Sequence, residues 1–218
     1  MDKNTTIKNT INFVKKELSD AEGGHDWFHI ERVYNNTKLI AKEEKVNKTV
    51  VELAALLHDI ADSKFHNGNE TIGPKKAKEF LESQEVTLEI MDHVIHIIAN
   101  MSFSKSLDTG TTFNSLELQV VQDADRLDAI GAIGIARAFN YGGFKNRAIY
   151  NPEIKPNLNF TKEAYKKSEA PTINHFYEKL LLLKDKMNTK TGKKIADQRH
   201  QFIVLYLEQF YAEWSGKR

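Results

Sequence analysis

The sequence predicts an all-α protein, and three observations support this fold class. Apolar residues recur every three or four positions along most of the chain, as Ile7, Ile11 and Val14 illustrate, and this is the spacing of one helix face. Two stretches, 50–62 and 115–139, are apolar on most of their surface, as expected of buried central helices. Helix-start signals precede several of the periodic segments.

The first half of the chain contains five periodic segments, at 7–18, 29–44, 50–62, 75–83 and 87–101. Asn47 or Thr49 is placed to cap the third, because both residue types accept a hydrogen bond from the first turn. Gly73-Pro74 announces the fourth, since proline is favoured at the first helical position. We therefore expect five helices before residue 102.

The second half begins with an apolar segment, 115–139, which we expect to form one central helix. Gly131 and Gly134 suggest a close backbone neighbour, because glycine lowers helix stability by about 1 kcal/mol. A helix break at these glycines is the alternative. The tail predicts two helices, at 173–187 and at about 191–214, with Asn188-Thr189 as the turn.

Three loops are expected between these elements, at about 62–72, 102–114 and 140–172. The last is long and polar, and a loop of that length often has a function, such as covering a site. No Pro/Gly/Ser-rich linker divides the 218 residues. We therefore expect a single domain, with a core at about 20–140 and a C-terminal helical extension at about 172–216.

Composition excludes several classes of protein. The net charge of +1 argues against nucleic-acid binding driven by bulk charge. The chain has no cysteine, which excludes disulfides and thiolate ligands and fits a reducing compartment. No run approaches the roughly 18 apolar residues of a membrane span, and the N-terminal segment does not resemble a signal peptide. We expect a cytoplasmic protein without a membrane partner.

Four ionisable residues lie in or beside strongly apolar helical segments: His29, His58, Asp59 and Asp125. Residues 53–57, just before two of them, are all apolar. Burial of several ionisable groups is unfavourable unless a partner compensates it, and a divalent metal is the obvious shared partner. Imidazole and carboxylate ligands suit a fairly hard ion. For the His58-Asp59 dipeptide alone, a hydrogen-bonded histidine beside a capping aspartate is the alternative.

The order of these residues resembles the HD-domain superfamily of metal-dependent phosphohydrolases. The chain has His29, then His58-Asp59, then Asp125, and the flanking motifs HDxxHxxRV at 25–33 and ADRL at 124–127 match as well. The strings QDADRLDAIGAIGIAR and FYEKLLLLKDKMNTKTGKK are similar to a small, single-domain bacterial branch linked with nucleoside triphosphate pyrophosphohydrolysis. The resemblance implies an HD-type helical bundle in which His29, His58, Asp59 and Asp125 ligate one divalent metal.

The resemblance also implies an activity. It indicates hydrolysis of a phosphoanhydride of (deoxy)nucleoside triphosphates to monophosphate and pyrophosphate, by attack of a water bound to the metal. Manganese is favoured as the ion, and magnesium, iron, nickel or zinc are also expected to bind. A phosphomonoesterase or phosphodiesterase acting on another nucleotide is one alternative. A non-catalytic regulator that binds metal and nucleotide is another. The chain is expected to act as a monomer or a homodimer.

Asp62 is the predicted general acid or base. It lies four residues after His58 and three after Asp59, which places it on the same face if the helix continues. A surface carboxylate is the alternative. The residues expected to bind the substrate phosphates are Arg32, Lys64, His66, His93, Arg126 and Lys145. Solvated side chains or ion pairs are their alternatives. Met101 stands where many relatives have histidine, which leaves a one-metal and a two-metal site both open.

Overall fold

The computed structural model describes residues 2–19, 26–61, 69, 71–101, 113–159 and 168–217. In these ranges the chain forms helices and no strand, so the all-α prediction is confirmed. The chain divides into two compact units, Met1–Asp125 and Arg126–Arg218, and each is described by itself. The expected single domain, with its core at about 20–140 and extension at about 172–216, stays a prediction.

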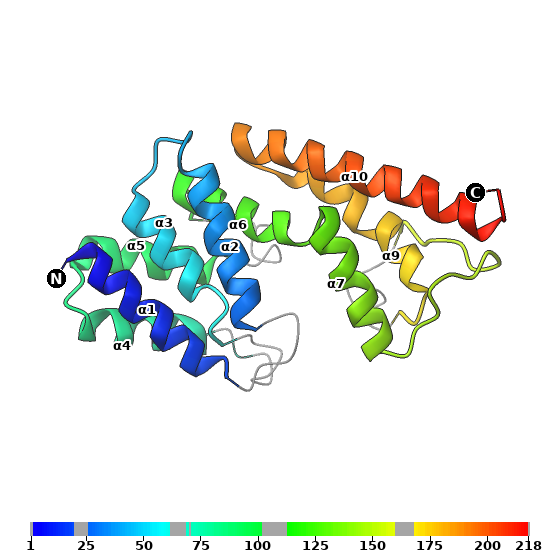
Figure 1. Ribbon diagram of the computed structural model, residues 1–218. Helices are drawn as coiled ribbons and strands as arrows, with labels where there is room; N and C mark the ends of the chain where they lie inside the picture. The colour runs from blue at the N-terminus through cyan, green and yellow to red at the C-terminus, as the bar shows by residue number, and fades with distance from the viewer. Residues whose placement is uncertain are drawn as a thin grey trace. The chain divides into compact units, whose positions relative to one another are not determined.

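The N-terminal unit is built around one buried helix. Its elements are α1 (Lys3–Glu17), α2 (Trp27–Ile40), α3 (Lys48–Leu57), α4 (Ile72–Ser83), α5 (Leu88–Ala99) and most of α6 (Leu116–Asp128) (Figure 1). Helix α3 packs against α1, α2 and α5. Residues 53–57 of α3 are fully buried, as their apolar composition predicts. Helix α3 therefore leads from the buried core of the unit directly to the partly exposed His58.

Side chains define where α2 and α3 begin and end. Asp26 caps α2, and Asn47 caps α3 by accepting hydrogen bonds from two backbone amides. The predicted helix at 50–62 is wrong at its described end, since α3 ends at Leu57 and residues 58–61 form turns. The ring of His58 donates to the carbonyl of Ala55 at 2.9 Å. Because the side chain takes up a carbonyl of the last turn, the helix need not continue.

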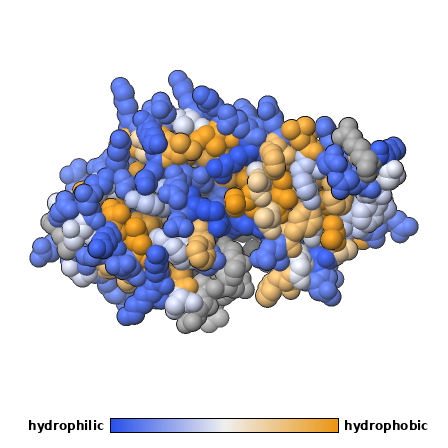
Figure 2. Space-filling model, in the orientation of Figure 1, coloured by the Kyte–Doolittle hydropathy of each residue, from blue (hydrophilic) through white to orange (hydrophobic). Residues whose placement is uncertain are grey.

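The C-terminal unit contains the last turn of α6, α7 (Gly131–Phe144), α9 (Thr172–Glu178), the 3-10 helix η3 (Leu180–Lys186) and α10 (Lys190–Trp214). Helix α10 packs against α7 and η3, and α9 packs against both of these as well. Ile173, Phe176 and Ile203 are fully buried between these elements. Hydrophobic surface gathers over α7 on the face that Figure 2 shows.

The expected single helix at 115–139 is wrong, and the alternative of a break is correct. Helix α6 ends at Asp128 and α7 begins at Gly131. Gly131 has a φ of +76°, a conformation that glycine adopts readily and other residues do not. The predicted helix at 173–187 is likewise two elements, α9 and η3. Thr189 caps α10, as expected for the turn before it.

All three predicted loops fall partly outside the described residues. The loop expected at 140–172 begins later than predicted, because α7 continues to Phe144. Helix α4 begins at Ile72, close to the predicted end of the first loop. Of the helices that the structure describes, none is long and apolar enough to cross a membrane.

Candidate metal centre

Three of the four predicted metal ligands meet in the N-terminal unit. His29 lies in α2, His58 follows α3 and Asp125 lies in α6, and their ligand atoms are within 4.8 Å of one another. His29 Nε2 is 3.5 Å from Asp125 Oδ1. The two imidazole rings have centroids 5.6 Å apart and an interplanar angle of 64°. Side chains from three separate helical segments thus converge on one point.

Local structure holds both imidazoles in place. His29 is in the first turn of α2, where its backbone amide donates to the Asp26 carboxylate at 2.9 Å, and its surface is 3% exposed. His58 Nδ1 is 2.9 Å from the carbonyl oxygen of Ala55. Because a carbonyl only accepts hydrogen bonds, Nδ1 carries a proton, which leaves Nε2 as the nitrogen that could bind a metal. A backbone contact of this kind orients many metal-binding histidines.

Asp125 lies next to a hydrogen bond that links α2 to α6. Its neighbour Ala124 is fully buried, and the carbonyl oxygen of Ala124 accepts a hydrogen bond from Asn36 Nδ2 at 3.2 Å. That bond joins α2 to α6 one residue before Asp125. The side chain of Asp125 is 42% exposed, whereas that of His29 is 4% exposed. The cluster therefore has a buried imidazole on one side and a solvent-accessible carboxylate on the other.

This donor set fits a divalent metal ion. Two imidazole nitrogens and a carboxylate oxygen form a mixed site that suits zinc, iron or manganese. The separation of 3.5 Å between His29 and Asp125 is longer than an ordinary N–H···O hydrogen bond of roughly 2.7–3.2 Å. The pair is therefore better described as two ligands facing a common point than as a closed hydrogen bond.

Asp59 lies within the part of the chain that the structure describes, but it is not one of the three residues whose ligand atoms converge. It lies in the turn after α3, directly after His58, and is partly exposed. Adjacent residues of a helical turn point about 100° apart, so His58 and Asp59 could share one ion only if it sat between their two directions. A fourth ligand from Asp59 stays a prediction.

Asn36 is a residue of the site that the sequence analysis did not identify. It is buried at 8% exposure on the α2 face that also contains Val33 and Ile40. A polar residue in an apolar helix face was the available signal, because a buried amide needs partners. Which carbonyl it would meet depends on the packing of α2 against α6.

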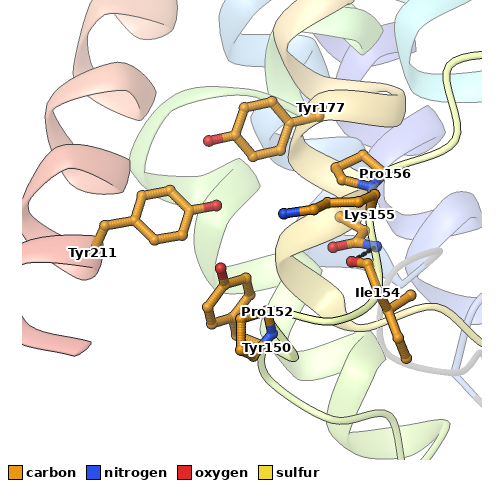
Figure 3. A pocket seen from close by; sticks show the side chains of 8 residues that line it. Tyr150, Pro152, Ile154, Lys155, Pro156, Tyr177 and Tyr211 are labelled. Carbon is orange, nitrogen blue, oxygen red and sulfur yellow. Dashed lines mark hydrogen bonds between the residues drawn. The ribbon is translucent and has the colours of Figure 1, made fainter. Parts of the chain in front are cut away.

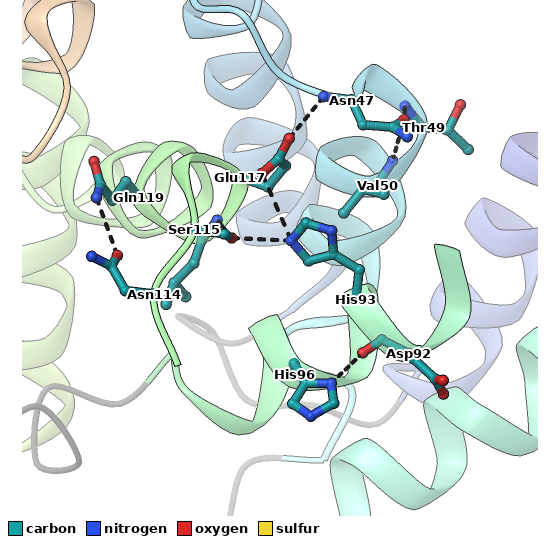
Figure 4. A network of polar contacts seen from close by, with 11 residues as sticks. Asn47, Thr49, Val50, Asp92, His93, His96, Asn114, Ser115, Glu117 and Gln119 are labelled. Atoms are coloured by element: carbon teal, nitrogen blue, oxygen red, sulfur yellow. Dashed lines mark hydrogen bonds and ion pairs between the residues drawn. The ribbon is translucent and has the colours of Figure 1, made fainter. Parts of the chain in front are cut away.

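His93, predicted to bind substrate, lies in a polar network of the N-terminal unit. Its Nε2 is 3.0 Å from Ser115 Oγ and 3.7 Å from Glu117 Oε2 (Figure 4). Ser115 Oγ also accepts from the amide of Leu118 at 3.1 Å, and Glu117 Oε1 accepts from the amide of Asn47 at 2.9 Å. The network joins α5, the start of α6 and the start of α3. A substrate contact of His93 stays a prediction.

The other predicted substrate residues are spread over the chain. Arg32 is partly buried, one turn after His29 in α2. In the C-terminal unit, Arg126 donates to the carbonyl of Lys186 at 2.7 Å. The ammonium of Lys145 lies 4.9 Å from the ring centroid of Phe144. Asp62, Lys64 and His66 lie outside the described residues. The substrate contacts and the catalytic role of Asp62 stay predictions.

Comparisons with known proteins agree with the geometry. The family model described as HD domain matches residues 27–130. The protein YpgQ of Bacillus subtilis (strain 168) is 38% identical over 204 residues, which cover 94% of this chain and 91% of YpgQ. The span from residue 27 to residue 130 contains His29, the His58-Asp59 dipeptide and Asp125.

Solved structures share the fold. An HD-superfamily hydrolase from Bacillus thuringiensis has a TM-score of 0.80 and 45% identity, over 98% of this chain and 99% of that one. The crystal structure of Bacillus subtilis YpgQ in complex with ADP has a TM-score of 0.75 and 34% identity, over 98% and 97% of the two chains. This chain therefore belongs to the HD-domain superfamily of hydrolases.

Proposed function

We propose that this chain is a metal-dependent phosphohydrolase that acts on nucleotides. In this proposal it cleaves a phosphoanhydride of (deoxy)nucleoside triphosphates and releases monophosphate and pyrophosphate. The observation that carries the proposal is the convergence of His29, His58 and Asp125 within 4.8 Å. The presence of ADP in the YpgQ complex supports a nucleotide as substrate, because ADP contains the phosphoanhydride that such an enzyme would recognise.

The ion would be held by His29, His58 and Asp125, with Asp59 as a proposed fourth ligand. When bound, a divalent ion lowers the pKa of water and stabilises negative charge on phosphoryl oxygens. Manganese is our favoured ion, and magnesium, iron, nickel and zinc are the others to test. The donor set contains no sulfur, since the chain has no cysteine, and oxygen and imidazole ligands suit these ions.

The chain's own groups have separate tasks in this proposal. The burial of His29 and the backbone contact of His58 keep both rings fixed, so little reorganisation is needed when an ion or substrate arrives. Asp125 and His58 are the partly exposed members of the cluster, and substrate would approach from their side. Asp62 would accept or supply a proton. Arg32 and the other predicted basic residues would pair with the phosphates, as guanidinium and ammonium groups do with oxyanions.

A nucleotide screen tests the proposal. Ribo- and deoxynucleoside triphosphates, monophosphates and cyclic nucleotides are each incubated with the protein and one of the five ions, and products are separated by anion-exchange chromatography. Monophosphate together with pyrophosphate is the expected result. Release of orthophosphate from monophosphates, or opening of a cyclic ester, would favour the alternative hydrolases. Saturable binding of nucleotide without turnover would favour a non-catalytic regulator.

A matched pair of variants assigns any turnover to the site. Asp125→Asn removes a ligand charge and is expected to abolish product formation. Asp92→Asn makes the same change at an exposed position of α5 and is expected to retain it. Equal loss in both variants would remove the support that the cluster gives to the proposal.

A further inference from the structure

The C-terminal unit contains a pocket that shares no residue with the candidate metal centre. Its volume is about 300 Å³, at the lower end of the range of roughly 300–1,000 Å³ that is usual for small-molecule sites. The lining residues come from the segment 150–156, from α9 and from α10. They are Tyr150, Pro152, Ile154, Lys155, Pro156, Asn174, Tyr177 and Tyr211 (Figure 3).

Hydrogen-bond donors converge in this pocket. Figure 3 shows the hydroxyl groups of Tyr150, Tyr177 and Tyr211 and the ammonium group of Lys155 pointing toward the same space. Each of these hydroxyl groups can donate a hydrogen bond to a guest. Burial, and then the neighbouring Tyr177 hydroxyl, raise the pKa of Tyr211, so this phenol stays neutral and protonated at physiological pH.

The charge of the lining residues indicates whether the pocket favours a cation or an anion. Among the lining residues that the structure describes, Lys155 is the only charged one. Within the described part of the chain, no carboxylate forms an ion pair with its ammonium group. An ammonium beside neutral hydroxyl groups disfavours a cation and favours an oxyanion, which accepts charge-assisted hydrogen bonds. Pro152, Ile154 and Pro156 supply apolar surface beside these donors.

Hydrogen bonds and ring contacts tie parts of the pocket wall together. Asn174 is 1% exposed, and its Nδ2 donates to the carbonyl of Ile154 at 3.0 Å. The amide of Asn157 donates to Glu178 Oε1 at 3.0 Å. The ring of Tyr150 lies 5.4 Å from that of Tyr211 and 5.0 Å from that of Trp214, between centroids. A pre-organised wall reduces the ordering that binding would otherwise require.

We propose that this tyrosine pocket binds a small organic anion. The phosphate or carboxylate of the guest accepts hydrogen bonds from Lys155 and from the tyrosine hydroxyl groups. Its apolar ring lies against Pro152, Ile154 and Pro156. This site is independent of the proposed phosphohydrolase activity.

Trp214 provides a direct readout, because its ring lies beside Tyr150. In a Trp27→Phe background Trp214 is the only tryptophan left, and its emission reports on the pocket. The full chain is titrated with phenylphosphonate, benzoate and benzyl alcohol, in the presence of a chelator that keeps metal away from the candidate centre. A saturable change with phenylphosphonate or benzoate, and none with benzyl alcohol, is expected. The two acids together show which oxyanion is preferred.

Variants locate the binding. Lys155→Met is expected to raise the dissociation constant at least about tenfold, which corresponds to about 1.4 kcal/mol, and Lys155→Arg is expected to restore most of the affinity. Tyr177→Phe, which removes one hydroxyl, should weaken binding as well. Lys193→Met removes an exposed lysine elsewhere in α10 and should leave the affinity unchanged. Circular dichroism checks that each variant is folded.

Several outcomes would overturn the proposal. These are equal binding of benzyl alcohol, equal weakening by Lys193→Met, and no saturable change with either acid. A further control is His58→Asn. If that variant lost binding while Lys155→Met kept it, the anion would sit at the candidate metal centre. The tyrosine pocket would then have no ligand, and the proposed hydrolase would be unaffected.

Discussion

His29 Nε2 lies 3.5 Å from Asp125 Oδ1, although the two residues belong to the second and the sixth helix of the chain. The imidazole is almost fully buried, and the carboxylate is 42% exposed. The cluster therefore combines a buried imidazole with a charged group that solvent reaches. Asp125 is the only carboxylate among the three converging groups, so it is the most informative position to mutate.

Asp125→Asn is expected to remove the bound metal. The amide keeps the size of the side chain but loses the charge that attracts the ion. The loss of affinity should exceed the roughly 10–100-fold that removal of an outer partner usually causes. Elemental analysis of purified protein measures it. Asp92→Asn should keep its metal, and a normal metal content in Asp125→Asn would show that the cluster is not a metal site.

Metal removal should lower thermal stability reversibly. An ion that binds only the folded state adds about 2.7 kcal/mol to the free energy of unfolding at one hundred times its dissociation constant. A chelator should lower the melting temperature of the parent protein, and added manganese should restore it. The same treatment should leave the melting temperature of Asp125→Asn unchanged. An equal response in both proteins would mean that the ion binds elsewhere.

Asp62→Asn separates metal binding from proton transfer. We expect the variant to keep its metal and to lose turnover by roughly 10²–10⁴-fold, the usual effect of removing a general acid or base. Steady-state kinetics on the best nucleotide, combined with elemental analysis, provides both readouts. Asp59→Ala is the companion variant, and it should lose metal if Asp59 is the fourth ligand. Wild-type turnover in Asp62→Asn would leave His93 as the next candidate.

Local patterns predicted most helices, whereas contacts distant in sequence determined the rest. The apolar run at 53–57 was enough to predict a central helix. The break between α6 and α7 depends on Gly131, which has a positive φ and lies against the side chain of Arg199 from α10. Arg199 is distant in sequence, so only the folded structure shows this contact. For the same reason the order of His29, His58 and Asp125 was visible in the sequence, but the support of Asn36 was not.

Gly131→Ala should destabilise the C-terminal unit by about 1–2 kcal/mol, the usual effect of placing an L-residue at positive φ. An added Cβ would also lie 3.0 Å from Arg199 Cγ, and Arg199 donates to the carbonyl of Leu127 at 2.5 Å. Urea denaturation measures the change. Gly143→Ala is the control, because its Cβ would meet nothing within 4 Å. Gly143→Ala should leave stability unchanged or raise it. A similar loss of stability in both variants would rule out a special conformation at Gly131.

Arg137→Met should destabilise the protein because it leaves a buried carboxylate without one of its partners. Arg137 Nη1 lies 2.5 Å from Asp128 Oδ2, and the side chain of Asp128 is 1% exposed. Breaking such a pair typically costs about 3–5 kcal/mol, and we expect about 2–3 because Arg199 is also close to Asp128. Lys75→Met breaks an exposed pair with Glu79 and should change stability by less than about 0.5 kcal/mol. Urea midpoints compare the two variants.

His175 should make the stability of the protein fall in mild acid. Burial, with Lys179 and Arg147 nearby, lowers the pKa of His175 from 6.5 to about 4. Between these pH values the unfolded chain takes up a proton that the folded chain does not, so stability falls as pH decreases through this window. The resulting loss in the free energy of unfolding reaches about 3 kcal/mol near pH 4. His175→Gln should show a shallower pH dependence of the urea midpoint, and His96→Gln, at an exposed position, should not.

Helix α1 lies outside the span that the HD-domain family model matches, which begins at residue 27. It nevertheless packs against α3, and its own residues Thr10 and Val14 are fully buried. Lys3 of α1 also forms an ion pair with Glu52 of α3 at 2.9 Å. A fragment trimmed to the matched span would expose the apolar side of the helix that leads into His58, and it should aggregate. The part of the chain that supports the candidate metal centre therefore includes a helix outside the span by which the family is recognised.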